Sequence, residues 1–133
     1  MSLFTWPVRV YYEDTDAGGI VYYANYLKFF ERARTEWLRA AGVSQQSMFD
    51  EHGAGFVVRS AQIDYHAAAR LDDHLTLTLD IAKFGRASVI FSQQALRGDL
   101  LLASAQVKVG CVDLSTLRPR AFPDDAAVRM RAT

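Results

Sequence analysis

Residues 22–41 read YYANYLKFFERARTEWLRAA, and their apolar side chains recur every three or four positions. That spacing predicts an amphipathic helix of four to five turns with a single apolar stripe. The stripe consists of Leu27, Phe30, Ala33, Trp37, Leu38 and Ala41. Gly42 follows directly and is expected to end the helix, because glycine readily adopts the left-handed conformation of a C-terminal cap. Such a helix has to bury its stripe against a second layer of the protein.

The chain on both sides of this helix has the alternating pattern of β-strands. Val8, Val10 and Tyr12 predict a first strand that begins after Pro7. Further strands are expected over residues 57–65, 75–81, 87–96 and 101–112, with a hairpin turn at 97–99, a short helix at 45–51 and a terminal helix or tail at 124–131. One strand, one long helix and four more strands define the α+β class, in which the helix packs on the sheet.

Length and composition favour one soluble domain and exclude several function classes. The chain has 133 residues, 50% of them hydrophobic, and we expect residues 1–133 to form a single domain. Lys plus Arg and Asp plus Glu number 15 each, which leaves no basic field for nucleic acid. Cys111 is the only cysteine and lies in an apolar run typical of a core thiol. Without a signal-peptide pattern or an apolar stretch of about 20 residues, we expect a cytoplasmic protein that does not insert into membranes.

An acidic turn, Asp14-Thr15-Asp16-Ala17-Gly18-Gly19, separates the first strand from the long helix. Its glycines allow a sharp bend and leave backbone N–H groups unobstructed. A helix start presents unpaired N–H groups that can stabilise a carbonyl oxygen under attack, and a neighbouring carboxylate can attack that carbonyl or activate water. The alternative is that one acid caps the helix and the glycines only shape the turn. Spacing alone favours this structural alternative.

The acidic turn belongs to a longer sequence pattern that extends over most of the chain. The segments that carry the pattern are Val8–Tyr22, Asn25-Tyr26, Glu31–Glu36, Phe56–Arg59, Ala69–Asp73, Cys111–Asp113 and Arg118–Arg120. Together they resemble hotdog-fold thioesterases, most closely the 4-hydroxybenzoyl-CoA thioesterase family in its Tol–Pal-associated acyl-CoA thioesterase branch. The resemblance covers nearly the whole chain. It implies a hotdog fold, in which a five-stranded antiparallel sheet wraps one long central helix.

The resemblance also implies roles for individual residues. The family's catalytic aspartate falls on Asp16, which would act on the thioester carbonyl as a nucleophile or through water as a general base. The oxyanion donor falls on the backbone N–H of Tyr23, a position at which close relatives carry histidine. Asp14 is the competing acid. Glu31 is a third candidate, because another hotdog branch places its carboxylate on the central helix, although an ion pair with a neighbouring arginine is the favoured interpretation.

Substrate contacts are expected at two places. Gly19 in the acidic turn and Val58 on a predicted strand would contact the acyl part of the substrate. Lys83, Arg86 and Ser88 belong to a basic turn between two strands, and in this family the corresponding turn lies near the pantetheine and phosphates of CoA. Arg86 suits phosphate because its guanidinium presents a fork of donors. The competing interpretation of this turn is an ordinary solvated hairpin.

The sequence therefore predicts an acyl-CoA thioesterase that uses no metal and no cofactor. Its expected partners are an acyl-CoA substrate and acyl carrier protein. Family members form dimers that pair into tetramers, so Asp16 and Arg86 would meet from different chains. Two other classes stay open: a hotdog dehydratase or hydratase, whose histidine is missing from the segment between turn and helix, and a non-catalytic module that binds acyl-CoA or acyl carrier protein. The sequence does not specify the acyl chain.

Overall fold

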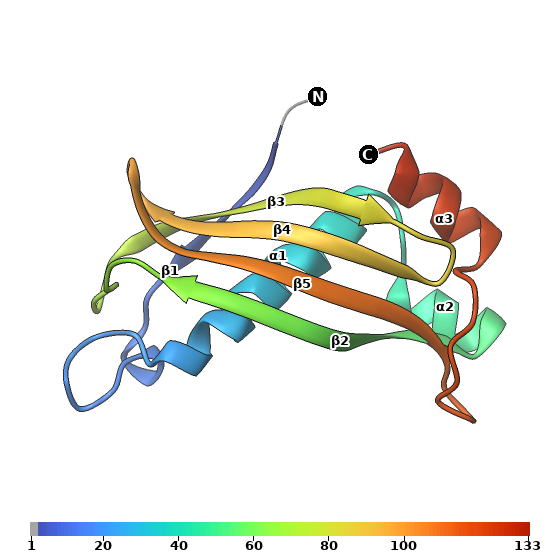
Figure 1. Ribbon diagram of the computed structural model, residues 1–133, viewed down its shortest axis with the longest axis horizontal. Coiled ribbons are helices and arrows are strands. Elements are labelled where there is room, and N and C mark those ends of the chain that lie inside the picture. The colour runs from blue at the N-terminus through green and yellow to red at the C-terminus, as the bar shows by residue number, and fades with distance from the viewer. Residues whose placement is uncertain (1–2) are drawn as a thin grey trace.

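The long helix is the centre of the fold in a computed structural model that describes residues 3–133 (Figure 1). Met1 and Ser2, which belong to the domain expected over 1–133, lie outside these residues. Helix α1 spans Tyr26–Ala40 and is preceded by a 3-10 turn, η2, over Tyr23–Asn25, so the α-helix begins later than the periodicity predicted. Gly42 follows with a φ of 82°, which confirms the predicted glycine at the helix end.

Five antiparallel strands form one sheet, and α1 lies across one of its faces (Figure 1). The strands are β1 Phe4–Arg9, β2 Ala54–Tyr65, β3 His74–Phe84, β4 Ser88–Arg97 and β5 Leu100–Asp113. Their order is β1-β3-β4-β5-β2, so β1 and β2 form the two edges. β1 includes Pro7 and ends at Arg9, whereas the alternation predicted a strand beginning after Pro7. Proline is tolerated there because β1 pairs on one side only, with β3.

The core fills the space between α1 and the sheet. On α1 the buried side chains are Tyr26, Phe29, Phe30, Ala33, Trp37 and Leu38. The prediction of Leu27 as a core residue is wrong, since 44% of it is exposed. Leu27 is in the first turn of α1, whereas the buried Leu38 occupies nearly the same angle around the helix close to its other end, so position along the helix, and not angle, distinguishes the two.

Strand β5 supplies much of the sheet's contribution to the core. The alternating residues Ala103, Ala105, Val107, Val109 and Cys111 are buried as predicted, and Leu102 and Val112 near the two ends of the strand are buried as well. Burial raises the pKa of the Cys111 thiol, which Arg120 offsets in part. Cys111 is therefore the packed core thiol expected from its apolar neighbours.

Two shorter helices lie at one end of the sheet (Figure 1). α2 spans Gln45–His52, and α3 spans Asp124–Arg131, so the terminal segment is a helix and not a tail. The Ser44 hydroxyl caps α2 by accepting a hydrogen bond from the Ser47 N–H at 3.1 Å. Across residues 3–133, none of the helices is long and apolar enough to cross a membrane.

Candidate active site

The acidic turn folds as a small hairpin in which Thr15 and Val21 form an isolated antiparallel bridge. The Asp16 N–H donates to the Ile20 carbonyl at 2.9 Å, and the Gly19 N–H donates to the Asp16 carbonyl at 3.0 Å. Gly19 has a φ of 79°, a conformation that strains any residue with a Cβ atom. A Cβ atom at Gly19 would meet no heavy atom within 4 Å, so the backbone there is open to an approaching molecule.

Asp16 is exposed at the beginning of this hairpin. Its Oδ1 accepts a hydrogen bond from the Gly18 N–H at 2.8 Å, which orients the carboxylate relative to the turn. Within residues 3–133 no hydrogen bond reaches its Oδ2. A Cβ atom at Gly18 would lie 3.2 Å from Oδ1, so a glycine leaves room for this arrangement. One carboxylate oxygen of Asp16 is thus held, and the other is available to a substrate.

Asp14 has the opposite environment and is only 4% exposed. Its Oδ2 accepts from the Tyr11 N–H at 2.8 Å, and its Oδ1 accepts from Nδ2 of Asn25 at 2.9 Å. Its carbonyl accepts from the Tyr22 N–H at 3.0 Å. Asp14 therefore links Tyr11, which follows β1, to Asn25 at the end of η2. Both of its carboxylate oxygens accept hydrogen bonds. Asp14 thus has a structural role, but the helix cap that spacing favoured for one of the two acids is not found, since no side chain caps η2 or α1 within residues 3–133.

Tyr23 is the first residue of η2, and its N–H consequently has no partner inside that turn. No hydrogen bond from this N–H is found elsewhere within residues 3–133. The Tyr23 carbonyl accepts from the Tyr65 hydroxyl at 2.8 Å, and the side chain of Tyr23 is 62% exposed. A hydrogen bond with Tyr23 and the charge of Tyr23 raise the pKa of Tyr22, and the charge of Asp16 adds to this effect. The charge of the Asp16 carboxylate therefore acts on the ionisation of Tyr22 next to Tyr23.

A cavity of about 110 Å³ lies between α1 and strands β2, β4 and β5. Val58, predicted to contact substrate, lines this cavity together with Phe56 and Val57, although 54% of Val58 is exposed. Other apolar lining residues are Leu38, Val89, Phe91, Val109 and Met130. The cavity thus offers an apolar wall next to the middle of the long helix.

Glu31 also lines this cavity, and its Oε1 accepts a hydrogen bond from the Thr35 hydroxyl at 3.0 Å. Within residues 3–133 it forms no ion pair with an arginine, so that interpretation of Glu31 is wrong. Arg34 donates instead to Oε1 of Gln93 at 3.0 Å, and Nε2 of Gln93 donates to the Phe30 carbonyl at 3.0 Å. Burial lowers the pKa of Arg34, and the charge of Glu31 offsets part of that effect.

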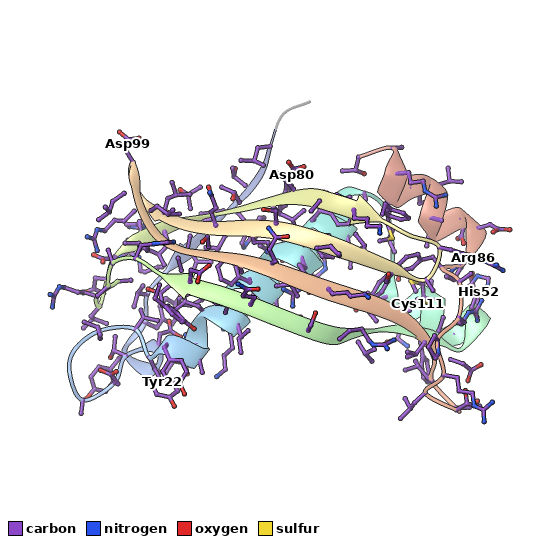
Figure 2. All side chains as sticks on the ribbon, viewed as in Figure 1. Tyr22, His52, Asp80, Arg86, Asp99 and Cys111 are labelled. Atoms are coloured by element: carbon purple, nitrogen blue, oxygen red, sulfur yellow. The ribbon has the colours of Figure 1, made fainter. Side chains whose placement is uncertain are left out.

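The basic turn between β3 and β4 carries Lys83, Arg86 and Ser88. Lys83 and Arg86 are exposed, and the Arg86 carbonyl accepts from the Phe122 N–H at 3.0 Å, which holds the turn to the chain before α3. Figure 2 shows Arg86 and Tyr22 at opposite ends of the long axis, and Tyr22 adjoins the Asp16 hairpin. One chain therefore does not bring the basic turn together with Asp16.

The loop between β2 and β3, residues 66–73, contacts the site although the sequence did not predict it. The Val21 N–H donates to the Ala69 carbonyl at 2.9 Å, and Ile20 forms an isolated bridge with Arg70. Ala69–Asp73 belongs to the pattern that resembles the thioesterases, but its residues have no periodicity or charge run that would connect them with the acidic turn. Only the family pattern could have drawn attention to this loop.

Comparison with known proteins identifies the class. Residues 10–130 match the family described as the Thioesterase-like superfamily. The match covers most of the chain, and the chain belongs to that superfamily. The α+β hotdog fold implied by the resemblance, with a long helix against a five-stranded antiparallel sheet, is confirmed.

Particular relatives within this superfamily are highly similar. Acyl-CoA thioesterase YbgC of Haemophilus influenzae is 51% identical over 122 residues, which cover 92% of this chain and 90% of that protein. Acyl-CoA thioester hydrolase YbgC of Escherichia coli is 50% identical over 123 residues, with coverage of 92% and 91%. Among solved structures, the probable thioesterase from Bartonella henselae has a TM-score of 0.81 and 34% identity, with coverage of 92% and 100%. The predicted kinship with acyl-CoA thioesterases is confirmed.

Proposed function

We propose that this protein hydrolyses an acyl-CoA thioester to a free acid and CoA. The observation that carries the proposal is the arrangement of Asp16, whose Oδ1 is held by Gly18 while Oδ2 has no partner within residues 3–133. Tyr23 is the first residue of the helical segment that follows the hairpin, and its N–H has no partner within residues 3–133. A reactive carboxylate and an oxyanion donor are the two parts that acyl transfer to water requires. The names of the two YbgC relatives support acyl-CoA as the substrate.

Two chemical routes use the Asp16 carboxylate and yield the same products. As a general base, Asp16 accepts a proton from water while the water oxygen attacks the thioester carbon. The Tyr23 N–H donates to the resulting oxyanion, and its collapse breaks the C–S bond, so that the CoA thiolate leaves and takes up the proton. As a nucleophile, Asp16 attacks the carbon itself and expels the thiolate, and water then cleaves the mixed anhydride. If water attacks the Asp16 carbonyl carbon of that anhydride, turnover in heavy-oxygen water labels the Asp16 carboxylate, which the general-base route never does; trapping of the anhydride by hydroxylamine detects the nucleophilic route when water attacks the acyl carbon instead.

Binding of the substrate is proposed to involve both ends of the molecule. In a site formed by two chains, the open backbone at Gly19 of one chain and the apolar cavity beside Val58 of the other would receive the acyl group. The basic turn with Lys83, Arg86 and Ser88 would hold the phosphates of CoA, because guanidinium and ammonium groups both pair with phosphate.

A second chain is proposed to complete the site, since the basic turn lies far from Asp16 in one chain (Figure 2). β2 is an edge strand of 12 residues, and its outer side has no partner strand within residues 3–133. Antiparallel pairing of two β2 edges about a two-fold axis would turn the Asp16 end of one chain toward the Arg86 end of its partner. Two such dimers would pair into the tetramer that the family resemblance implies.

The family resemblance also predicts properties of the protein outside its active site. Acyl carrier protein as a partner, a link to the Tol–Pal system, a cytoplasmic location and a single domain over residues 1–133 all stay predictions. None of them is needed for the chemistry assigned to Asp16.

Thiol release from a panel of acyl-CoAs tests the proposed function. The comparison uses the wild type, Asp16→Asn and Asp80→Asn. Asp80 is a matched control, since it is exposed on β3 and, among the described residues 3–133, its Oδ1 accepts only from the adjacent Ile81 N–H. We expect Asp16→Asn to lower kcat by about 10²-fold or more, while Asp80→Asn changes it little. Equal release by wild type and Asp16→Asn on every substrate would show that the Asp16 mechanism is wrong. No release by the wild type from any acyl-CoA would overturn the function itself.

A further inference from the structure

The loop of residues 66–73 first meets the chain just before the acidic turn. The Val10 N–H donates to the Asp73 carbonyl at 2.9 Å, and the Asp72 N–H donates to the Val10 carbonyl at 3.0 Å. Asp72 has a φ of 68°, a left-handed conformation that non-glycine residues keep only where the surroundings hold them. These two hydrogen bonds fix the chain that enters the turn.

The same loop meets the chain again where it leaves the turn. The Val21 N–H donates to the Ala69 carbonyl at 2.9 Å, and Ile20 bridges with Arg70. Ile20 in turn accepts the hydrogen bond from the Asp16 N–H at 2.9 Å. The backbone of Asp16 is therefore one hydrogen bond away from a segment that the loop holds in place.

Arg97, the last residue of β4, joins this loop to the middle of the sheet. Its Nη1 donates to Oδ2 of Asp73 at 2.7 Å and to the carbonyl of Ala68 at 3.1 Å. Oδ2 of Asp73 also accepts from the Arg70 N–H at 2.9 Å. The side chains of Arg97 and Asp73 are 37% and 23% exposed, so the pair is partly shielded from water. Arg97 thus contacts the loop near its beginning, at Ala68, and at its last residue, Asp73.

We propose that Arg97 is a positioning residue for Asp16, acting through Asp73 and the loop of residues 66–73. The role rests on the proposed function, because it matters for catalysis only if Asp16 is the reactive carboxylate. A displacement of about 1 Å at a reacting group can cost about 10²-fold in rate, so a loop that fixes the hairpin on two sides has a direct effect on kcat. Contacts of CoA with the distant basic turn do not involve this loop, so we expect the effect on kcat to exceed any effect on KM through Gly19 of the hairpin.

Two readouts on Arg97→Ala test the proposal, with Arg39→Ala as the matched control. Arg39 is exposed on α1 and also forms an ion pair, with Glu36 at 2.8 Å, but it does not contact the loop. Amide hydrogen exchange is measured at Asp16 and Val21, whose N–H groups donate to Ile20 and Ala69. In parallel, kcat and KM are measured on the best acyl-CoA substrate, well below the melting temperature of each variant.

We expect Arg97→Ala to speed exchange at Asp16 and Val21 about tenfold or more while the amides of α1 keep their protection. We expect kcat to fall about tenfold or more with KM within about twofold, and added guanidinium ion at low concentration to restore part of kcat. Arg39→Ala should show none of these effects. Unchanged exchange at the two amides overturns the proposal, as does faster exchange with an unchanged kcat. A wild type that hydrolyses no acyl-CoA refutes only the function, because the exchange measurement still decides whether Arg97 holds the hairpin.

Discussion

Asp14 and Asp16, two aspartates separated by a single residue, have very different surroundings in the fold. Asp14 is buried, and its two oxygens accept from Tyr11 and Asn25. Asp16 is exposed, and a single hydrogen bond from Gly18 orients it. An acid with both oxygens occupied inside the protein supports the fold, whereas an acid with a free oxygen beside open N–H groups can react.

Alanine substitutions of Asp14 and Asp16 should change the free energy of unfolding by clearly different amounts. Asp14→Ala leaves the partly buried N–H of Tyr11 and the buried side-chain amide of Asn25 without partners, so we expect the free energy of unfolding to fall by about 2 kcal/mol. Asp16→Ala removes an exposed side chain, and we expect a change within about 0.5 kcal/mol. Urea unfolding monitored by circular dichroism measures both values. Equal losses of stability in the two variants would contradict the assignment of roles.

Among the elements, the contact between the loop of residues 66–73 and β4 depends on the charge of Asp73. Burial raises the pKa of this carboxyl, but hydrogen bonds from the Arg70 N–H and the Arg97 guanidinium outweigh that effect and lower the pKa below its ordinary value of 3.8. A carboxyl whose pKa is lower in the folded state contributes stability that is fully present above the unfolded-state pKa. That contribution is lost as the pH falls through the folded-state pKa.

We therefore expect the difference in unfolding free energy between wild type and Asp73→Asn to be constant above about pH 5 and to shrink below about pH 4. Urea unfolding of both proteins from about pH 7 down to about pH 2.5 measures this difference. A difference of the same size at both ends of the range would mean that the ionised carboxylate is not what holds the loop.

The elements also show which parts of the fold local patterns can predict. Alternation along β5, the helix stripe around Phe30 and the glycine at the end of α1 all depend on neighbours within a few positions. The alternation and the helix end were predicted correctly, but the predicted stripe included the exposed Leu27 and left out the buried Tyr26 and Phe29. Pro7 in β1 was missed because only the edge position of that strand makes a proline acceptable.

The candidate site was predictable to a smaller extent. Asp16 came from the family resemblance, since spacing alone could not separate it from Asp14. The loop contact through Ala69 and the pairing of Arg97 with Asp73 join segments far apart in the chain. Patterns within a short window of one sequence do not indicate such contacts, which only the three-dimensional fold shows.

At the scale of the whole molecule, the separation of Asp16 from Arg86 has a consequence that mixing experiments can detect. If each site takes Asp16 from one chain and Arg86 from the other, a mixed dimer of Asp16→Asn and Arg86→Ala has one intact site and one doubly altered site. Random association makes half of the dimers mixed, so co-refolding the two inactive variants should restore about a quarter of wild-type activity.

Steady-state thiol release before and after co-refolding measures this recovery. Sedimentation gives the assembly mass in multiples of the 14.9 kDa chain. Co-refolding Asp16→Asn with itself is the control and should recover nothing. No recovery in the mixture, with mixed assemblies present, would place Asp16 and the CoA-binding residues of each site on one chain.

The attachment of the Asp16 hairpin to a late part of the chain also sets an order of events during synthesis. The ribosome releases the hairpin among the first residues, but Ala69 and Asp73 follow only after α1 and β2, and Arg97 follows only after β3 and the rest of β4. A nascent chain that ends before Arg97 therefore carries Asp16, the proposed reactive carboxylate, without the contacts that shape its surroundings. Activity should arise late as the chain grows, and chains that end before Arg97 should cleave thioesters at least about tenfold more slowly than the 133-residue chain.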